Sequence, residues 1–359
     1  MQAAEDYPMA EGKNLVGADI GSSSIKVCQL KEGRKGVELI RLGYEPLPAQ
    51  TIVDGHVMNS GAVVESLSRI FRDQKIRTRD VAMSVSGQSV IIRKITVPMM
   101  TPAELNEQIQ WEAEQHIPFD IKDVQIDYEV LRRRPEASQM DLLLVAAKRD
   151  EIHDYAQLAR DAKLKPIVVD IDAFTIQNLF EFSRGLPSDQ VIALINVGAS
   201  LSTLNIVARG VSSFTRDIAN GGNMISDEIR KKLGIPFEQA EAMKCAPADT
   251  PGLPPQIRSI VDGVADTIAA EIQRSLDFFM ATSGEGEISK AYLTGGTSSL
   301  AVLAQAVERR SRVHVEVFSP MEKISIGAPE IDENLLAARG PQLAVALGLA
   351  MRKDREKRS

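Results

Sequence analysis

The sequence predicts an α/β protein built from two similar halves with a smaller inserted unit. Strand patterns and helical patterns follow one another along the whole chain. A strand–turn–strand stretch at residues 15–30 recurs at residues 191–207, about 180 residues later, which indicates an internal duplication. The chain has 359 residues, more than the roughly 250–300 at which a single core stops growing. We therefore expect at least two domains.

The composition restricts the functional class. Hydrophobic residues make up 44% of the chain and charged residues 25%, as in globular proteins, and the net charge of −7 argues against a general nucleic-acid binder. Cys28 and Cys245 lie far apart in apolar stretches, so we expect two buried free thiols. The first 13 residues lack the apolar core of a signal peptide, and no uncharged apolar run is long enough for a membrane-spanning helix. These features predict a cytoplasmic protein.

The turn Gly21-Ser22-Ser23-Ser24, between the first two strands, has a composition that suits a phosphate group. Gly21 lets the backbone bend, and successive N–H groups and hydroxyls can form an anion-binding concavity. Lys26 supplies a positive charge for a phosphate, and Asp19 can orient a metal-bound water. Because ordinary hairpin turns are also rich in glycine and serine, this stretch alone leaves both interpretations open.

A matching turn follows the strand at residues 191–197. Asn196, Gly198, Ala199 and Ser200 repeat the order of a polar residue, a glycine, a small residue and a hydroxyl before the next apolar strand. Two such turns suggest two halves that face a shared cleft, which weakens the interpretation as ordinary hairpins. Further along, the pair Gly295-Gly296 follows a strand, where missing side chains let the backbone approach a flat ligand.

The remaining elements are predicted from their apolar patterns and boundary residues. Strands are expected at residues 37–44, 81–86, 90–97, 124–131, 141–148 and 167–170, and a further strand ends at Phe214. Helices are expected at residues 62–71, 151–163, 236–244, 261–279 and 343–350, the last with small residues suited to close packing. Three more are expected from Thr101 to Pro118, from near Asp172 onward, and from after Met224 to Lys232.

Residues 87–166 have a character of their own and are interpreted as an inserted subdomain. Thr101-Pro102-Ala103-Glu104 is a capping-box signature for its first helix. Trp111 on that helix fits either core packing or partner packing. Arg132-Arg133-Arg134 is expected at a solvated hairpin tip rather than in a specific site for an acidic partner.

Five features in this order resemble the actin-like ATPase superfamily, which includes actin, Hsp70 and the sugar kinases. They are Asp19-Ile20-Gly21 with Lys26, Asp172 at a helix start, Asn196-Val197-Gly198, Glu241 with Lys244, and Gly295-Gly296-Thr297-Ser298-Ser299. The resemblance implies two duplicated domains of ribonuclease H-like fold, with ATP and Mg²⁺ between them.

The resemblance also implies roles for these residues. The first turn with Lys26 and the second turn at Gly198, Ala199 and Ser200 would hold the phosphates. The adenosine would lie against Glu241, Lys244, Gly295, Gly296 and Ser298, and Asp172 would orient the attacking water. Asp19 and Asn196 would face Mg²⁺. Relatives usually have Asp at position 196, and the Asn lacks the charge, so we expect ATP binding with at most slow hydrolysis.

A closer resemblance is to the PilM family of type IV pilus assembly proteins, relatives of the cell-division protein FtsA. It rests on residues 111–119, 169–174 and 273–279 and covers residues 14–351. It implies an FtsA-like 1C subdomain and the following division of the chain. Domain 1A comprises residues 14–86, 167–190 and 335–351, the 1C insertion 87–166, and domain 2 (2A/2B) 191–334, with a disordered N-terminus at 1–13 and a polar tail at 352–359.

This resemblance implies a cytoplasmic ATP-binding adaptor that partners recruit to the inner membrane. Its expected partner is the cytoplasmic N-terminal tail of PilN, bound between domain 1A and the 1C subdomain. Other pilus platform and motor ATPase proteins are further expected partners, and homo-oligomers stay open, whereas nucleic acid and direct membrane insertion are not expected. Two alternatives remain, an FtsA-like filament protein and a sugar-kinase-type phosphotransferase.

Overall fold

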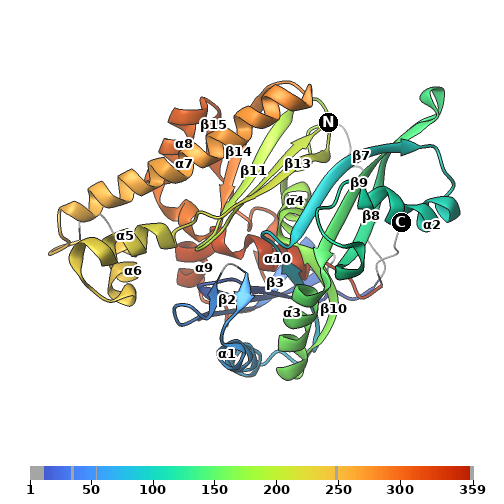
Figure 1. Cartoon of the computed structure of the whole chain (residues 1–359). Coiled ribbons are helices and arrows are strands. Elements are labelled where there is room, and N and C mark those ends of the chain that lie inside the picture. The colour runs from blue at the N-terminus through green and yellow to red at the C-terminus, as the bar shows by residue number, and fades with distance from the viewer. Residues whose placement is uncertain (1–11, 34–35, 54, 247–249, 356–359) are drawn as a thin grey trace.

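In a computed structural model, residues 12–33, 36–53, 55–246 and 250–355 are described. Two large sheets form the two halves of the molecule, and a smaller sheet projects beside them (Figure 1). Residues 1–11 of the predicted disordered N-terminus lie outside the described part. Among the described helices, none is long and apolar enough to cross a membrane.

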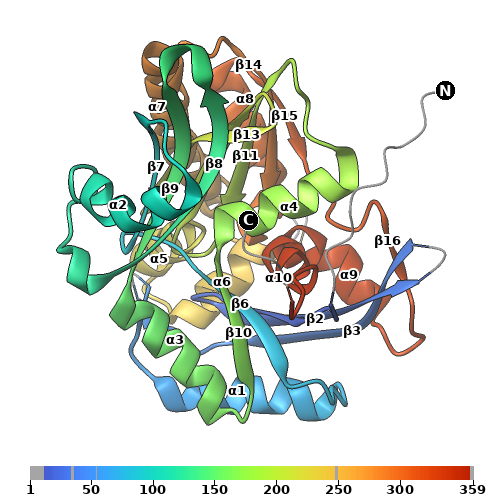
Figure 2. The same ribbon diagram turned by 90° about the vertical axis from the view of Figure 1, so that its right-hand side faces the viewer.

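The first half is a six-stranded sheet with the order β10-β6-β1-β2-β3-β16. Helices α1 and α3 cover one face, and α4 and α10 cover the other (Figure 2). The small hairpin β4 (Ile52–Val53) and β5 (His56–Val57) precedes α1. The bounds are β1 Val16–Ile20, β2 Ser24–Gly33, β3 Gly36–Pro46, β6 Asp80–Val85, β10 Lys165–Ile171, β16 Ile324–Ile326, α1 Ser60–Asp73, α3 Arg149–Asp161, α4 Asp172–Arg184 and α10 Ala344–Ala350.

The second half is a five-stranded sheet with the order β13-β12-β11-β14-β15. Helices α7 and α8 pack on one face, α4 lies against the other, and α5 and α6 pack beside α7. Helix α9 (Glu333–Arg339) precedes α10. The bounds are β11 Val191–Val197, β12 Ser202–Ala208, β13 Val211–Ile218, β14 Ile288–Thr294, β15 His314–Val317, α5 Asn223–Leu233, α6 Phe237–Cys245, α7 Gln256–Ser283 and α8 Ala301–Ser311.

The two sheets confirm the predicted duplication. In each half an antiparallel meander of three strands, β1-β2-β3 or β11-β12-β13, is followed by two strands parallel to its first one. Helices α4 and α10 pack together between the sheets, and a Cβ at Gly348 would lie only 2.2 Å from the carbonyl oxygen of Thr175. The small residues of α10 therefore permit the close packing that the sequence predicts.

The third sheet has the order β7-β9-β8 and carries α2. The bounds are β7 Val90–Pro98, α2 Pro102–Glu114, β8 Val124–Arg134 and β9 Gln139–Lys148. The capping box is confirmed, because Glu104 N–H donates to the Thr101 hydroxyl and Thr101 N–H donates to the Glu104 carboxylate. Trp111 is 72% exposed, so the core-packing alternative is wrong.

The predicted tip of the β8–β9 hairpin is wrong. Strand β8 continues through Arg134 because its ladder with β9 extends to the pair Arg134 and Gln139. Arg134 forms an ion pair with Asp141 at 2.5 Å, and Arg133 donates to the carbonyl of Met100 at 3.3 Å. The Arg132 side chain is exposed and, among the described residues, is the one of the three arginine side chains without a hydrogen bond or ion pair.

Helix α3 packs on the first half rather than on the insertion. Its buried side chains, which include Tyr155 and Leu158, join the core formed by β1, β2, β6 and α1. The core of the third sheet ends at Ala146. This packing favours an insertion that ends near Lys148 rather than at residue 166.

Three smaller predictions also need correction. Strand β13 ends at Ile218 instead of Phe214, because the ladder with β12 continues to that residue. Cys28 is buried, but Cys245 is exposed at the end of α6. The start of the predicted polar tail is fixed to the first half, since buried Lys353 forms an ion pair with Glu32.

Candidate functional site

The turn between β1 and β2 holds a buried ion pair. Asp19 and Lys26 lie opposite each other in the antiparallel ladder, with 3.1 Å between Asp19 Oδ2 and Lys26 Nζ. The ammonium also donates to the carbonyl of Ser24 at 3.3 Å, and a Cβ at Gly21 would lie 2.9 Å from it. Ser24 is buried in β2, whereas Ser22 is partly exposed and Ser23 is exposed. The Lys26 charge therefore lies directly over the glycine of the turn.

Asp172, the first residue of α4, lies near this turn. The Ser84 hydroxyl donates to Asp172 Oδ1 at 2.5 Å. Burial and then the negative charge of Asp19 raise the pKa of Asp172 to about 7, against the opposing effect of hydrogen bonds from Ser84 and Ser86. A carboxyl group that titrates near neutral pH is suited to accepting a proton from a water.

Asp217, on β13, brings a third carboxylate to the same place from the second half. Its Oδ2 accepts a hydrogen bond from the Gly87 N–H at 2.6 Å. Burial raises the pKa of Asp217, and its charge also contributes to the raised pKa of Asp172. Asp217 is absent from the predicted site because the predicted strand ends at Phe214, four residues too early.

The second turn, after β11, is fixed by two neighbouring segments. The carbonyl of Gly198 accepts from the Thr297 hydroxyl at 2.8 Å and from Gly222 N–H at 3.0 Å. The carbonyl of Ala199 accepts from the Asn223 N–H at 2.7 Å, and the side chain of Asn223 donates to the Ser200 hydroxyl at 3.0 Å. These hydrogen bonds fix the second turn to Thr297 and to the segment at residues 222–223.

The glycine pair lies beside the end of β11. A Cβ at Gly295, whose φ is +87°, would lie 2.4 Å from Asn196 Oδ1, so the structure brings these two predicted residues together. Gly296 lies against the side chain of Gln342. The Ser298 hydroxyl is buried and donates to the Gly295 carbonyl at 2.7 Å, so it stabilises the turn itself.

The Glu241 and Lys244 pair adjoins the second turn. Lys244 Nζ lies 2.6 Å from Glu241 Oε2 and 3.4 Å from the Gly222 carbonyl. Burial opposes ionisation of Glu241, but Lys244 and hydrogen bonds from Lys244, Ser226 and Cys245 outweigh it, so the pKa of Glu241 is lowered. A spacing that is common on helix surfaces thus belongs here to a partly buried network.

The predicted residues therefore form two groups, one on each half. Asp19, Lys26 and Asp172 lie together on the first half, and the second turn, the glycine pair, Asn196 and Lys244 lie together on the second. The contact between Gly87 and Asp217 joins the halves next to the first group. Within the described ranges, no three His, Cys, Asp or Glu side chains could hold a metal ion by themselves.

Comparison with known proteins identifies the family. The family model of the type IV pilus assembly protein PilM matches residues 17–354, nearly the whole chain. The chain belongs to the PilM family of type IV pilus assembly proteins. A solved PilM–PilN type IV pilus biogenesis complex is similar with a TM-score of 0.84 and 27% sequence identity, covering 96% of this chain and 100% of that one.

Two further known proteins are similar to this chain at lower identity. The cell-division protein FtsA of Neisseria meningitidis serogroup B is 22% identical over 381 residues, which is 92% of this chain and 88% of FtsA. The ethanolamine utilization protein EutJ of Carboxydothermus hydrogenoformans has a TM-score of 0.56 and 14% identity, covering 96% of this chain and 91% of EutJ. This PilM-family chain has the actin-like ATPase fold, as the sequence predicts.

Proposed function

We propose that this PilM-family protein is an adaptor that binds ATP between its two halves and binds the cytoplasmic N-terminal tail of PilN. ATP binding is supported by the two turns, which occupy equivalent positions in the two duplicated sheets. Each joins the first two strands of a duplicated sheet, and the first is overlaid by the Lys26 ammonium. Backbone N–H groups of such turns and a lysine are suited to phosphate oxygens.

The residues present fit a magnesium ion that arrives with the nucleotide. Asp19, Asp172 and Asp217 place negative charge close together, and the raised pKa values of Asp172 and Asp217 reflect the cost of burying that charge. A magnesium ion held at these residues would offset their charge and that of the phosphates. We assign Asp19 as its protein ligand, with Asn196 contributing through a water, and Asp172 as the residue that orients the attacking water.

We place the PilN tail where the insertion meets the first half. A cavity of about 190 Å³ lies at this junction. It is lined by Gly55, His56 and Val57 and by Lys148, Asp150, Glu151, Asp154 and Tyr155. The Tyr155 hydroxyl donates to the Gly55 carbonyl at 3.2 Å, so α3 is hydrogen-bonded to the β4–β5 hairpin beside this cavity. The similarity to a PilM–PilN complex supports this partner.

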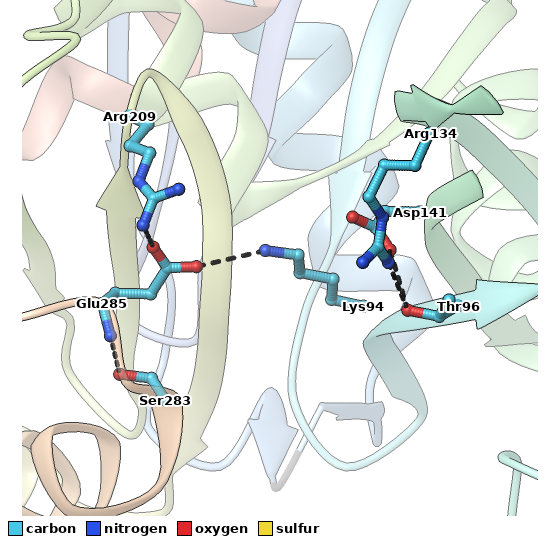
Figure 3. A network of polar contacts seen from close by, with 7 residues as sticks. All are labelled: Lys94, Thr96, Arg134, Asp141, Arg209, Ser283 and Glu285. Atoms are coloured by element: carbon cyan, nitrogen blue, oxygen red, sulfur yellow. Dashed lines mark hydrogen bonds and ion pairs between the residues drawn. The ribbon is translucent and has the colours of Figure 1, made fainter. Parts of the chain in front are cut away.

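Contacts between the insertion and the second half offer a route from nucleotide to partner. Glu285, after α7, lies between Arg209 and Lys94 of β7, at 2.9 Å and 3.3 Å (Figure 3). Together with the bond between Gly87 and Asp217, this ion pair ties the edge of the insertion to the second half. A nucleotide that changes how the halves meet would therefore shift the insertion and the proposed peptide site.

The test is a titration of the full chain with a fluorescent PilN N-terminal peptide, with and without Mg-ATP, followed by anisotropy. A fluorescent ATP analogue titrated separately reports nucleotide binding. We expect both ligands to bind, and ATP to change the peptide affinity. Equal peptide affinity with and without ATP would reject the coupling but keep the adaptor role. Absence of peptide binding in both conditions would reject the adaptor role.

The similarity to FtsA keeps filament formation as a second candidate. Sedimentation of the chain with ATP at modest concentration would favour it over the adaptor. Phosphoryl transfer to a sugar in an unbiased substrate screen would instead support the sugar-kinase alternative.

A further inference from the structure

Helix α2 carries an exposed tryptophan on a rigid support. Trp111 is the most exposed of the large hydrophobic side chains in the described residues. The opposite face of the helix, with Leu105, Ile109 and Ala113, is buried in the core of the insertion, and the capping box fixes the first turn. An indole held in this way loses little conformational freedom when a partner covers it.

The face around Trp111 is acidic. Its neighbours one turn away are Glu107, Gln108, Glu114 and Gln115, and all four are exposed. The helix contains four glutamates and no lysine or arginine. Glu104 belongs to the capping box, but Glu107, Glu112 and Glu114 form no ion pair with any other residue in the described ranges.

The negative charges in the last turn of α2 destabilise the helix. Glu112 and Glu114 lie near the C-terminus of α2, where the helix dipole favours cations and disfavours anions. The turn contains no basic residue that would compensate. A local arrangement that disfavours the helix, beside an exposed aromatic residue, indicates a surface shaped by binding rather than by folding.

We propose that this surface, formed by Glu107, Trp111 and Glu114, docks a basic segment of a partner protein. A lysine or arginine of the segment would lie over the indole, and others would pair with the glutamates. The net charge of −7 makes a second copy of the chain a poor electrostatic match. Helix α2, which carries these residues, lies at the outer edge of the insertion (Figures 1 and 2). It shares no residue with the cavity proposed for the PilN tail or with the nucleotide site, so each proposal can fail alone.

Trp111 is the only tryptophan of the chain, so its fluorescence reports on this surface directly. The probe is a synthetic peptide of about 16 residues, in which lysine and arginine alternate with leucine and alanine at helical spacing. Titrated into the full chain, it should give a saturable blue shift that weakens as salt is added. A peptide with glutamate at the basic positions should give none. An unchanged emission spectrum with the basic peptide would overturn the proposal.

Variants separate this surface from general charge attraction. Trp111→Ala should weaken binding of the labelled peptide about 30-fold, because tryptophans are frequent hot spots. It should not lower the melting temperature of the protein, because Trp111 is exposed. Glu107→Lys with Glu114→Lys should weaken it about tenfold or more. The matched control, Asp262→Lys with Asp277→Lys, changes the charge equally at exposed positions of α7. Equal loss in the control would show that only net charge matters. A mass change of Trp111→Ala in light scattering would assign the surface to self-association, and either result would overturn the proposal.

Discussion

Gly87 N–H donates a hydrogen bond of 2.6 Å to Asp217 Oδ2 and so joins the start of the insertion to the second half. The two residues are 130 positions apart in the sequence. Asp217 also acts electrostatically on Asp172 of the first half. The Asp217 side chain thus contacts the insertion and also interacts electrostatically with a carboxylate of the proposed nucleotide site. A substitution of Asp217 can therefore test whether nucleotide binding and PilN-tail binding are coupled.

Replacing Asp217 tests this connection. Asp217→Ala and Asp217→Asn both remove the buried charge, but only alanine removes the acceptor for Gly87 N–H. We expect Asp217→Ala to be less stable than Asp217→Asn by about 1–2 kcal/mol in urea unfolding. It should also lose the effect of Mg-ATP on PilN-peptide affinity, whereas Asp217→Asn keeps it. Identical behaviour of the two variants would contradict a role for the hydrogen bond.

The raised pKa of Asp172 predicts a pH dependence of stability. Its pKa is about 7 in the folded chain, against an ordinary value of about 4. The folded state binds the Asp172 proton more tightly than the unfolded state does. Protonation of Asp172 therefore stabilises the fold fully below about pH 4, and this stabilisation is lost as the pH rises to about 7. Asp172→Asn should therefore be more stable than wild type at pH 8, by on the order of 2 kcal/mol, and the gain should shrink towards pH 4. A gain independent of pH would show that Asp172 titrates normally.

Lys26→Ala should weaken ATP binding and destabilise the fold. The substitution removes the proposed phosphate contact and leaves Asp19 buried without its partner. We expect at least about tenfold weaker binding of a fluorescent ATP analogue and a loss of about 2–4 kcal/mol in the free energy of unfolding. Lys31→Ala is the control, because Lys31 is an exposed lysine of the same strand. Unchanged ATP affinity in Lys26→Ala would remove Lys26 from the nucleotide site.

Gly221→Ala should disturb the second turn. A Cβ at this position would lie 2.5 Å from the carbonyl oxygen of Ala199, so the turn must move. We expect about tenfold weaker ATP binding and a loss of about 1–3 kcal/mol in stability. Gly263→Ala on α7 is the matched control, since its Cβ would meet no atom within 4 Å. That variant should gain about 0.5–1 kcal/mol. If both variants bind ATP like wild type, the second turn does not contact the nucleotide.

The fold was predictable from the sequence because its signals are local. Alternating apolar residues, the capping box at Thr101 and the glycine turns at Gly21 and Gly198 depend only on near neighbours in the chain. The repeat of one turn in the other half then predicted the duplication, which the matching strand orders confirm. Sequence patterns could therefore predict which half of the molecule each of these site residues belongs to.

The tertiary structure alone decided which distant residues meet. Asp217 belongs to the site because β13 runs past Phe214 and the halves pack so that it reaches Gly87. Trp111 faces solvent because Leu105 and Ile109 take the core positions of α2. Burial and contacts between halves depend on how sheets pack, and no local spacing encodes this packing. The sequence by itself thus determined the elements, the duplication and the family, while the packing of the halves determined the connections between the sites.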